Sequence, residues 1–106
     1  MLQKLGLIFT TFFLIRKGYV GDVKLLFFGI ASDTSEMISF REDGIYERPM
    51  SERFIEDAKI SKTFLDIGAN IGNYSVLFRK ASTGKCFCWE PVAHFRMLHR
   101  MNQLIN

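Results

Sequence analysis

The chain has 106 residues, 48% of them hydrophobic, and its formal net charge at pH 7 is only +3. This length predicts one domain with a core of its own. The basic residues are scattered and form no arginine–lysine block with interleaved aromatic residues, which argues against a nucleic-acid partner.

The N-terminal segment carries an apolar run of eleven residues from Leu5 to Ile15, interrupted by Thr10 and Thr11. A membrane-spanning helix needs roughly 20 residues. No small-x-small cleavage pattern follows, which argues against a cleaved signal peptide. We expect a packed helix here and a cytoplasmic protein. A membrane-surface or signal-anchor role for Leu5 to Ile15 is the alternative, and it would make the protein membrane-associated.

The following segment predicts a small antiparallel meander. Gly18, Gly21 and Asp22 predict a break in the chain, and Val23 to Ile30 is an apolar, β-prone run. Met37 to Phe40 is a second short strand candidate. Two turn-like sequences flank it: Ser32 to Ser35 and Glu42 to Gly44.

Pro49 to Ile60 predicts a helix, because proline suits the first helical turn. Its apolar residues recur on one face: Met50, Phe54 and Ala58. Glu47 and Glu52 are acids near the start of this helix. Acids on a solvated helix are common, so we leave both out of the candidate site.

From Thr63 onward the sequence predicts a strand, a glycine loop, a helix, a turn and a second strand. These elements are the strand Thr63–Leu65, the loop Ile67–Gly72, the helix Ile71–Ala81 and the strand Lys85–Trp89. An acid follows each strand, Asp66 after the first and Glu90 after the second.

The loop has the residues that a nucleotide-type ligand requires. Gly68 and Gly72 permit tight turns and close approach of a ligand, and Asn70 tolerates left-handed backbone conformations almost as well. The free N–H groups of the following helix favour a carboxylate or phosphate. Glu90 lies 22 positions after Gly68. An acid at about that spacing reaches a ribose diol from the end of the next strand.

Two ligand classes fit such a unit. The dinucleotide pattern G-x-G-x-x-G fails here, because position 73 is Asn73. The run from Asp66 to Gly72 instead reads D-x-G-x-N-x-G, without the lysine and hydroxyl of a P-loop. An acid at the start of the loop repels phosphate and suits an ammonium or a sulfonium group. This favours S-adenosylmethionine, which carries both.

The run Leu65 to Gly72 together with Glu90-Pro91 resembles the FkbM-type methyltransferases, a class I S-adenosylmethionine-dependent family. Their pattern is [VIL]-D-[VIL]-G-A-N-x-G followed by E-P after the second strand. The resemblance is dense from about Ile45 to Asn106. It implies O-methyl transfer to a hydroxylated small molecule or glycan, with the cofactor bound by Asp66, Gly68, Ala69, Asn70, Gly72 and Glu90.

The resemblance also implies a partial Rossmann-like α/β fold. We expect an N-terminal helix, short antiparallel strands and a lead-in helix over residues 1–60, and the first βαβ unit of the cofactor domain over residues 61–106. The third strand and the acceptor pocket of the family are absent, and no catalytic residue is identified. We therefore expect a fragment that transfers no methyl group alone and self-associates through exposed apolar faces.

Two further interpretations stay open: a non-catalytic remnant of such an enzyme, and a membrane-associated interaction protein that acts through its apolar N-terminus. No metal site is expected. Cys86 and Cys88 alternate on one strand, and we expect two buried thiols rather than a disulfide or a metal ligand pair. His94 and His99 lie five residues apart in a predicted helix over Val92 to Asn106, and we expect both to face solvent. The apolar face expected of this helix is Val92, Phe95, Leu98, Met101 and Leu104.

Overall fold

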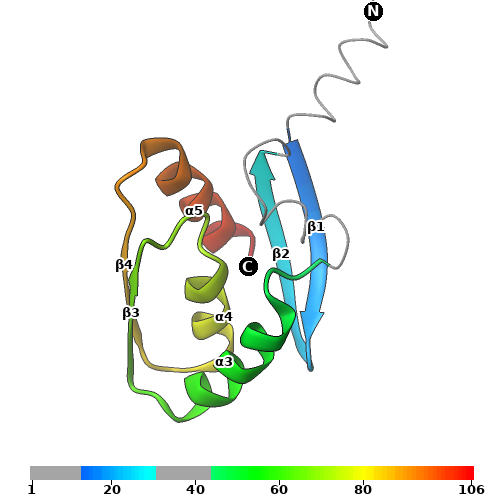
Figure 1. Cartoon of the computed structure of the whole chain (residues 1–106), viewed down its shortest axis with the longest axis vertical. Coiled ribbons are helices and arrows are strands. Elements are labelled where there is room, and N and C mark those ends of the chain that lie inside the picture. Colours follow the sequence, from blue (N-terminus) through cyan, green and yellow to red (C-terminus); the bar gives the residue numbers. More distant parts are fainter. Residues whose placement is uncertain (1–12, 31–43) are drawn as a thin grey trace, which may run out of the picture.

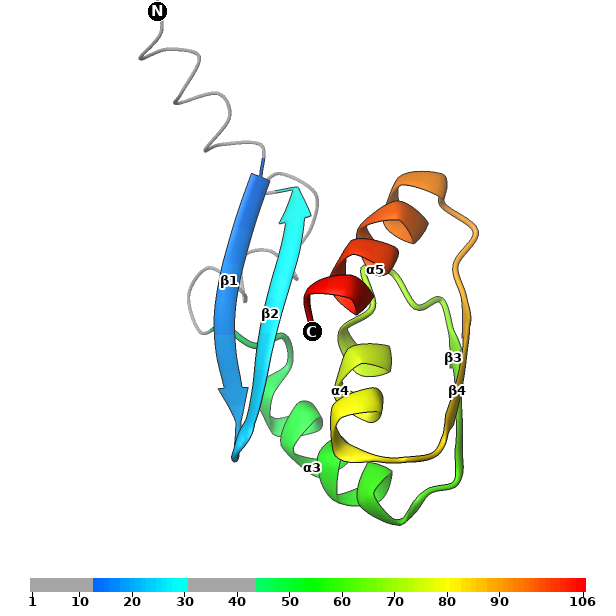
Figure 2. The ribbon, with the colours of Figure 1, turned by 180° about the vertical axis from the view of Figure 1, so that it is seen from behind.

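The structure is a computed structural model, and it describes residues 13–30 and 44–106. Two strands, a helix and a strand–helix–strand unit with a final helix follow one another along the chain. The elements are β1 (Phe13–Val20), β2 (Val23–Ile30), α3 (Arg48–Ile60), β3 (Thr63–Ile67), α4 (Asn73–Ala81), β4 (Lys85–Trp89) and α5 (Ala93–Ile105). The helices lie between the β1–β2 hairpin and the β3–β4 sheet (Figure 1). The reverse view shows the same three layers (Figure 2).

Strands β1 and β2 form an antiparallel hairpin whose register runs from Phe13↔Ile30 to Val20↔Val23. Gly21 has a φ of 59°, and two-residue hairpin turns need such positive values. The strand predicted from Val23 to Ile30 is confirmed. The second predicted strand, Met37 to Phe40, and most of its flanking turns lie outside the described residues.

The helix predicted for Leu5 to Ile15 is wrong at its described end, because residues 13–15 belong to strand β1. The rest of that run lies outside the described residues. The break predicted at Gly18 is also wrong, since Gly18 pairs with Leu25 inside the hairpin. A glycine is needed there for packing: a Cβ on Gly18 would lie 2.0 Å from the carbonyl oxygen of Gly44.

Helix α3 confirms the helix predicted from Pro49 to Ile60, with the proline in its first turn. Its buried residues are Ser51, Ile55 and Ala58. Met50 was predicted on the buried face but is exposed. Among the described residues, no helix has the length and apolar character needed to cross a bilayer.

Strands β3 and β4 are parallel, in register from Thr63↔Lys85 to Ile67↔Trp89, and helix α4 connects them. This pair confirms the predicted strand–helix–strand order of a small α/β unit. Helix α4 begins at Asn73, two residues later than predicted, because Gly72 takes a left-handed conformation at the helix start. Leu65, Ile67, Phe87 and Trp89 are exposed on this small sheet.

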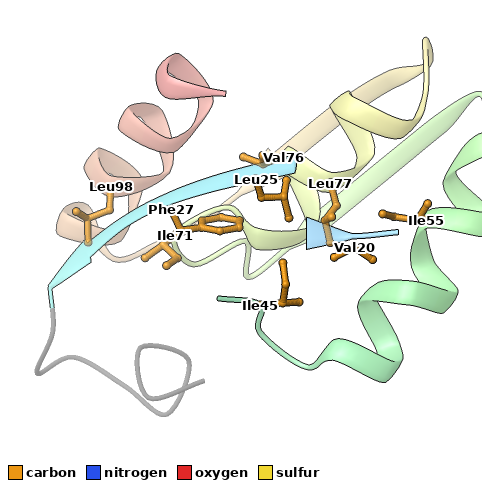
Figure 3. Close-up of a cluster of buried hydrophobic side chains, with 9 residues drawn as sticks. All are labelled: Val20, Leu25, Phe27, Ile45, Ile55, Ile71, Val76, Leu77 and Leu98. Atoms are coloured by element: carbon orange, nitrogen blue, oxygen red, sulfur yellow. The ribbon is translucent and has the colours of Figure 1, made fainter. Parts of the chain in front are cut away.

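The hydrophobic core lies between the hairpin and the helices (Figure 3). Its members come from both sides of residue 60: Val20, Leu25, Phe27, Ile45, Ile55, Ile71, Val76, Leu77 and Leu98. Helix α5 closes one edge of β2 with side-chain amides. Asn102 Oδ1 accepts from Phe28 N at 2.6 Å, and Asn106 Oδ1 accepts from Leu26 N at 2.8 Å. These bonds replace a neighbouring strand at that edge.

The buried face of α5 is therefore partly polar, and three predictions about it are wrong. Leu104 and Val92 were expected on the apolar face and are exposed, Leu104 to 85%. His99 was expected to face solvent and is buried. Asn102 occupies the position that an apolar pattern would fill, and its Nδ2 also donates to Ile71 O at 2.8 Å. The exposed position predicted for His94 is confirmed.

Candidate functional site

The glycine loop folds over the carboxyl end of β4. The backbone N–H groups of Gly68 and Ala69 both donate to Trp89 O, at 2.8 and 2.9 Å. Gly68, Asn70 and Gly72 have φ values of 76°, 52° and 93°. The alternate positions predicted to need glycine or asparagine are thus the ones that adopt left-handed conformations.

Glu90 holds this loop through its carboxylate. Its Oε2 accepts from Asn70 N at 2.7 Å, and its Oε1 accepts from Val92 N at 3.0 Å. A carboxylate has about four acceptor positions, so this anchoring leaves capacity for a ligand. The structure therefore brings the loop and the Glu-Pro sequence together, although they lie 20 residues apart. Sequence reasoning assigned Glu90 to a ligand and missed its role as an anchor of the loop.

Asp66 is buried at the end of β3 and is held from helix α4. Ser75 Oγ donates to Asp66 Oδ2, and Cys88 Sγ lies 3.1 Å from Ser75 Oγ. The first acid of the motif is therefore fixed by the helix that the loop begins. No sequence pattern singled out Ser75, but its place three residues after Gly72 puts it in the first turn of α4.

The two glycines of the loop differ in their surroundings. A Cβ on Gly68 would meet no atom within 4 Å, whereas a Cβ on Gly72 would lie 2.3 Å from Cδ2 of His99. Gly68 therefore borders open space that a ligand can approach. Gly72 allows α5 to pack against the loop, and burial lowers the pKa of the His99 imidazole there.

A cavity of about 210 Å³ lies between this loop and the segment before α3. It is lined by Tyr46, Glu47, Asp66, Gly68, Ala69, Asn70, Ile71, Asn73 and Tyr74. The lining contains two carboxylates and no lysine, arginine or histidine. All the predicted site residues except Gly72 and Glu90 border this cavity.

Glu47 is the site residue that the sequence analysis considered and set aside. It has a φ of 47°, unusual for a residue other than glycine, and Tyr74 Oη donates to its Oε2 at 2.6 Å. Burial, followed by the hydrogen bond to Glu47, raises the pKa of Tyr74. The tyrosine therefore stays a hydrogen-bond donor at any physiological pH.

Asn73 is a buried residue of the site whose side-chain amide makes no hydrogen bond to the described residues. This residue is 6% exposed, and its Oδ1 and Nδ2 have no hydrogen-bond partner among the described residues. Sequence reasoning used Asn73 only to exclude a dinucleotide pattern. Its burial arises from its position as the first residue of α4, directly after Gly72.

A second cavity, of about 430 Å³, lies beside β4 and α5. It is lined by Arg79, Cys86, Cys88, Arg96, His99, Arg100 and Gln103. The prediction of two buried thiols is wrong, because Cys88 is exposed and Cys86 is only half-buried. The two sulfur atoms are 3.5 Å apart, and burial raises the pKa of Cys86 to about 12. Within residues 13–30 and 44–106, no group of histidine, cysteine and acidic residues is arranged to hold a metal ion.

Comparisons of this chain with protein-family models, with curated proteins and with solved structures gave no match.

Proposed function

We propose that this chain binds S-adenosylmethionine at the glycine loop, as the cofactor-binding unit of an FkbM-type class I methyltransferase with a Rossmann-like fold. The observation that carries the proposal is the hydrogen bond from Asn70 N to Glu90, because it joins the two halves of the motif in one site. The parallel β3–β4 pair with its crossover helix supports it.

The residues present fit such a ligand. Glu90 lies at the end of the second strand with acceptor capacity left for ribose hydroxyls. Gly68 borders open space where a side chain would obstruct the ligand. When bound, the cofactor supplies an activated methyl group. The protein's contribution is to position the cofactor and the acceptor.

The charge at the site favours this ligand over a dinucleotide. The cavity beside the loop contains Glu47 and Asp66 and no cationic residue, so it repels a pyrophosphate and attracts a cationic group. Position 73 carries a buried asparagine where a dinucleotide loop has its third glycine. The acceptor is proposed to be a hydroxyl group of a small molecule or glycan.

Calorimetric titration of the purified chain with S-adenosylmethionine and, separately, with NAD tests the proposal. We expect binding of S-adenosylmethionine alone. Asp66→Asn keeps an acceptor for Ser75 but removes the charge, and it is expected to weaken binding about tenfold. The matched control is Asp57→Asn, which removes an exposed charge on α3. Binding of NAD without S-adenosylmethionine would contradict the proposal.

A further inference from the structure

The cavity beside β4 and α5 concentrates positive charge that the cofactor motif does not use. Three arginines line it: Arg79 from α4, and Arg96 and Arg100 from α5. Among the described residues, its lining contains no aspartate or glutamate. Its volume of about 430 Å³ lies within the roughly 300–1,000 Å³ of small-molecule pockets. Charge and size therefore fit an anionic ligand.

These arginines have no ion-pair partner that would explain them. In residues 13–30 and 44–106, no carboxylate forms a salt bridge with any of the three, and Arg100 makes no hydrogen bond either. Helix α5 contains no acidic residue, so Arg96 and Arg100, one turn apart on the same face, repel each other without compensation. An anion bound between them would offset this repulsion.

Two of the arginines are held in place by the surrounding chain, unlike the mobile side chains of a solvated basic surface. Arg96 Nη1 donates to two backbone carbonyl oxygens just before α5, at 3.0 and 2.6 Å. Arg79 Nη1 donates to Gln103 Oε1, and Gln103 Nε2 donates in turn to His99 Nε2 at 3.0 Å. Each bond uses one nitrogen of a guanidinium group, so the other nitrogens stay available as donors. This fixation lowers the entropy cost of binding a ligand.

The other side chains around the cavity do not compete for the arginines. Cys86 lines it from β4, and burial raises the pKa of this thiol to about 12, so it is neutral at physiological pH. The carboxylates of Asp66 and Glu90 act on the neighbouring His99. Each of these carboxylates already accepts hydrogen bonds, from Ser75 and from backbone N–H groups respectively. An anion in the cavity therefore meets unpaired donors.

We propose that this cavity binds a phosphate group, held by the guanidinium groups of Arg79, Arg96 and Arg100. A guanidinium group presents its N–H donors in a planar fork that matches two phosphate oxygens. A phosphate monoester has three terminal oxygens and a charge of about −1.5 to −2 at pH 7, so it accepts from several forks at once. A carboxylate has two oxygens and a single charge, and it would leave more of these donors unpaired. The proposal does not depend on cofactor binding.

A nuclear magnetic resonance titration of the whole ¹⁵N-labelled chain, at an ionic strength held constant with chloride, tests this site. Inorganic phosphate should shift the signals of Arg79, Arg96 and Arg100 in a saturable way, and acetate should bind at least tenfold more weakly. Glucose 6-phosphate identifies the source of the phosphate. Tighter binding than that of inorganic phosphate assigns a phosphorylated small molecule, and binding that is no tighter assigns free phosphate; both results support a phosphate site.

Variants of Arg100 test the guanidinium contacts. Arg100→Gln should weaken phosphate binding about tenfold, the loss typical of a hydrogen bond to a charged group. Arg100→Lys keeps the charge but not the fork, so it should lose part of this affinity. Arg53→Gln, the same change on an exposed residue of α3, should leave the affinity unchanged. Arg100 is exposed, so its variants should retain the fold, which circular dichroism verifies.

Four results would each overturn the phosphate site. They are the absence of saturable shifts at millimolar phosphate, binding of acetate as tight as that of phosphate, wild-type phosphate affinity in Arg100→Gln, and shifts confined to loop residues such as Gly68 and Asn70. The last result would place the anion at the glycine loop instead of the cavity.

Discussion

Glu90 is expected to contribute to stability and to ligand binding, and Glu90→Ala should reduce both. The variant removes two hydrogen bonds from backbone N–H groups, those of Asn70 and Val92. A hydrogen bond to a charged group contributes about 1.5–3 kcal/mol, and partial exposure of Glu90 places these two at or below the lower end. We therefore expect the free energy of unfolding to fall by about 2–3 kcal/mol. Affinity for S-adenosylmethionine should fall by a further 1.5–3 kcal/mol, or about 10- to 150-fold.

Urea unfolding and calorimetric titration measure the two effects of Glu90 separately. Glu90→Gln keeps one acceptor oxygen, so it should lose about half of the stability that Glu90→Ala loses. A change in the free energy of unfolding below about 0.5 kcal/mol for Glu90→Ala would refute the anchoring of the loop. An affinity within about twofold of the wild type, under roughly 0.5 kcal/mol, would show that Glu90 does not contact the ligand.

Three further predictions concern the loop, the buried histidine and the exposed sheet. Gly68→Ala should weaken S-adenosylmethionine binding and lower the free energy of unfolding by about 1–2 kcal/mol, because alanine disfavours the positive φ. Gly72→Ala should destabilise the fold more, because its added Cβ would also collide with His99, and equal losses of the two variants in urea unfolding would contradict this. Because burial lowers the pKa of His99, the unfolded state binds more protons than the folded state as the pH falls below about 6.5, so the free energy of unfolding should fall with the pH there; His99→Gln should weaken this dependence, and an unchanged pH dependence in urea unfolding would contradict it. Trp89 is 71% exposed on the sheet, so the chain should self-associate and Trp89→Lys should reduce this in light scattering; a wild-type monomer at high concentration would contradict it.

The elements that the sequence predicted best are those with strong local patterns. The glycine loop, helix α4 and strand β4 follow from residue types within 30 positions, and the left-handed φ values fall at Gly68, Asn70 and Gly72. The spacing also placed Glu90 beside the loop. These predictions succeeded because turns and parallel strand ends depend on nearby residues.

The errors arise from contacts between distant parts of the chain. Asn102 bonds to Phe28 across 74 residues, so the buried face of α5 is polar where an apolar pattern was expected. Gly18 lies inside a strand because Gly44 packs against it. A single sequence contains no periodic pattern that reports such contacts.

The candidate site was incomplete in the sequence for the same reason. Glu47 meets Tyr74 across 27 residues, and this contact makes it part of the cavity. The residue type was visible, but an acid before a helix is common. The sequence could not predict that the side-chain amide of Asn73 is unpaired, because an unpaired amide is unusual only where it is buried, and its burial depends on the fold.

A nuclear magnetic resonance titration of the ¹⁵N-labelled chain tests the central claim most directly, since it reports weak binding residue by residue. The account predicts that S-adenosylmethionine shifts the backbone amide signals of Gly68, Asn70 and Gly72 in a saturable way, and that NAD at the same concentrations does not. Saturable shifts confined to residues beside the other cavity, such as Arg79 and Arg100, or no shifts at millimolar S-adenosylmethionine, would contradict the proposed cofactor site.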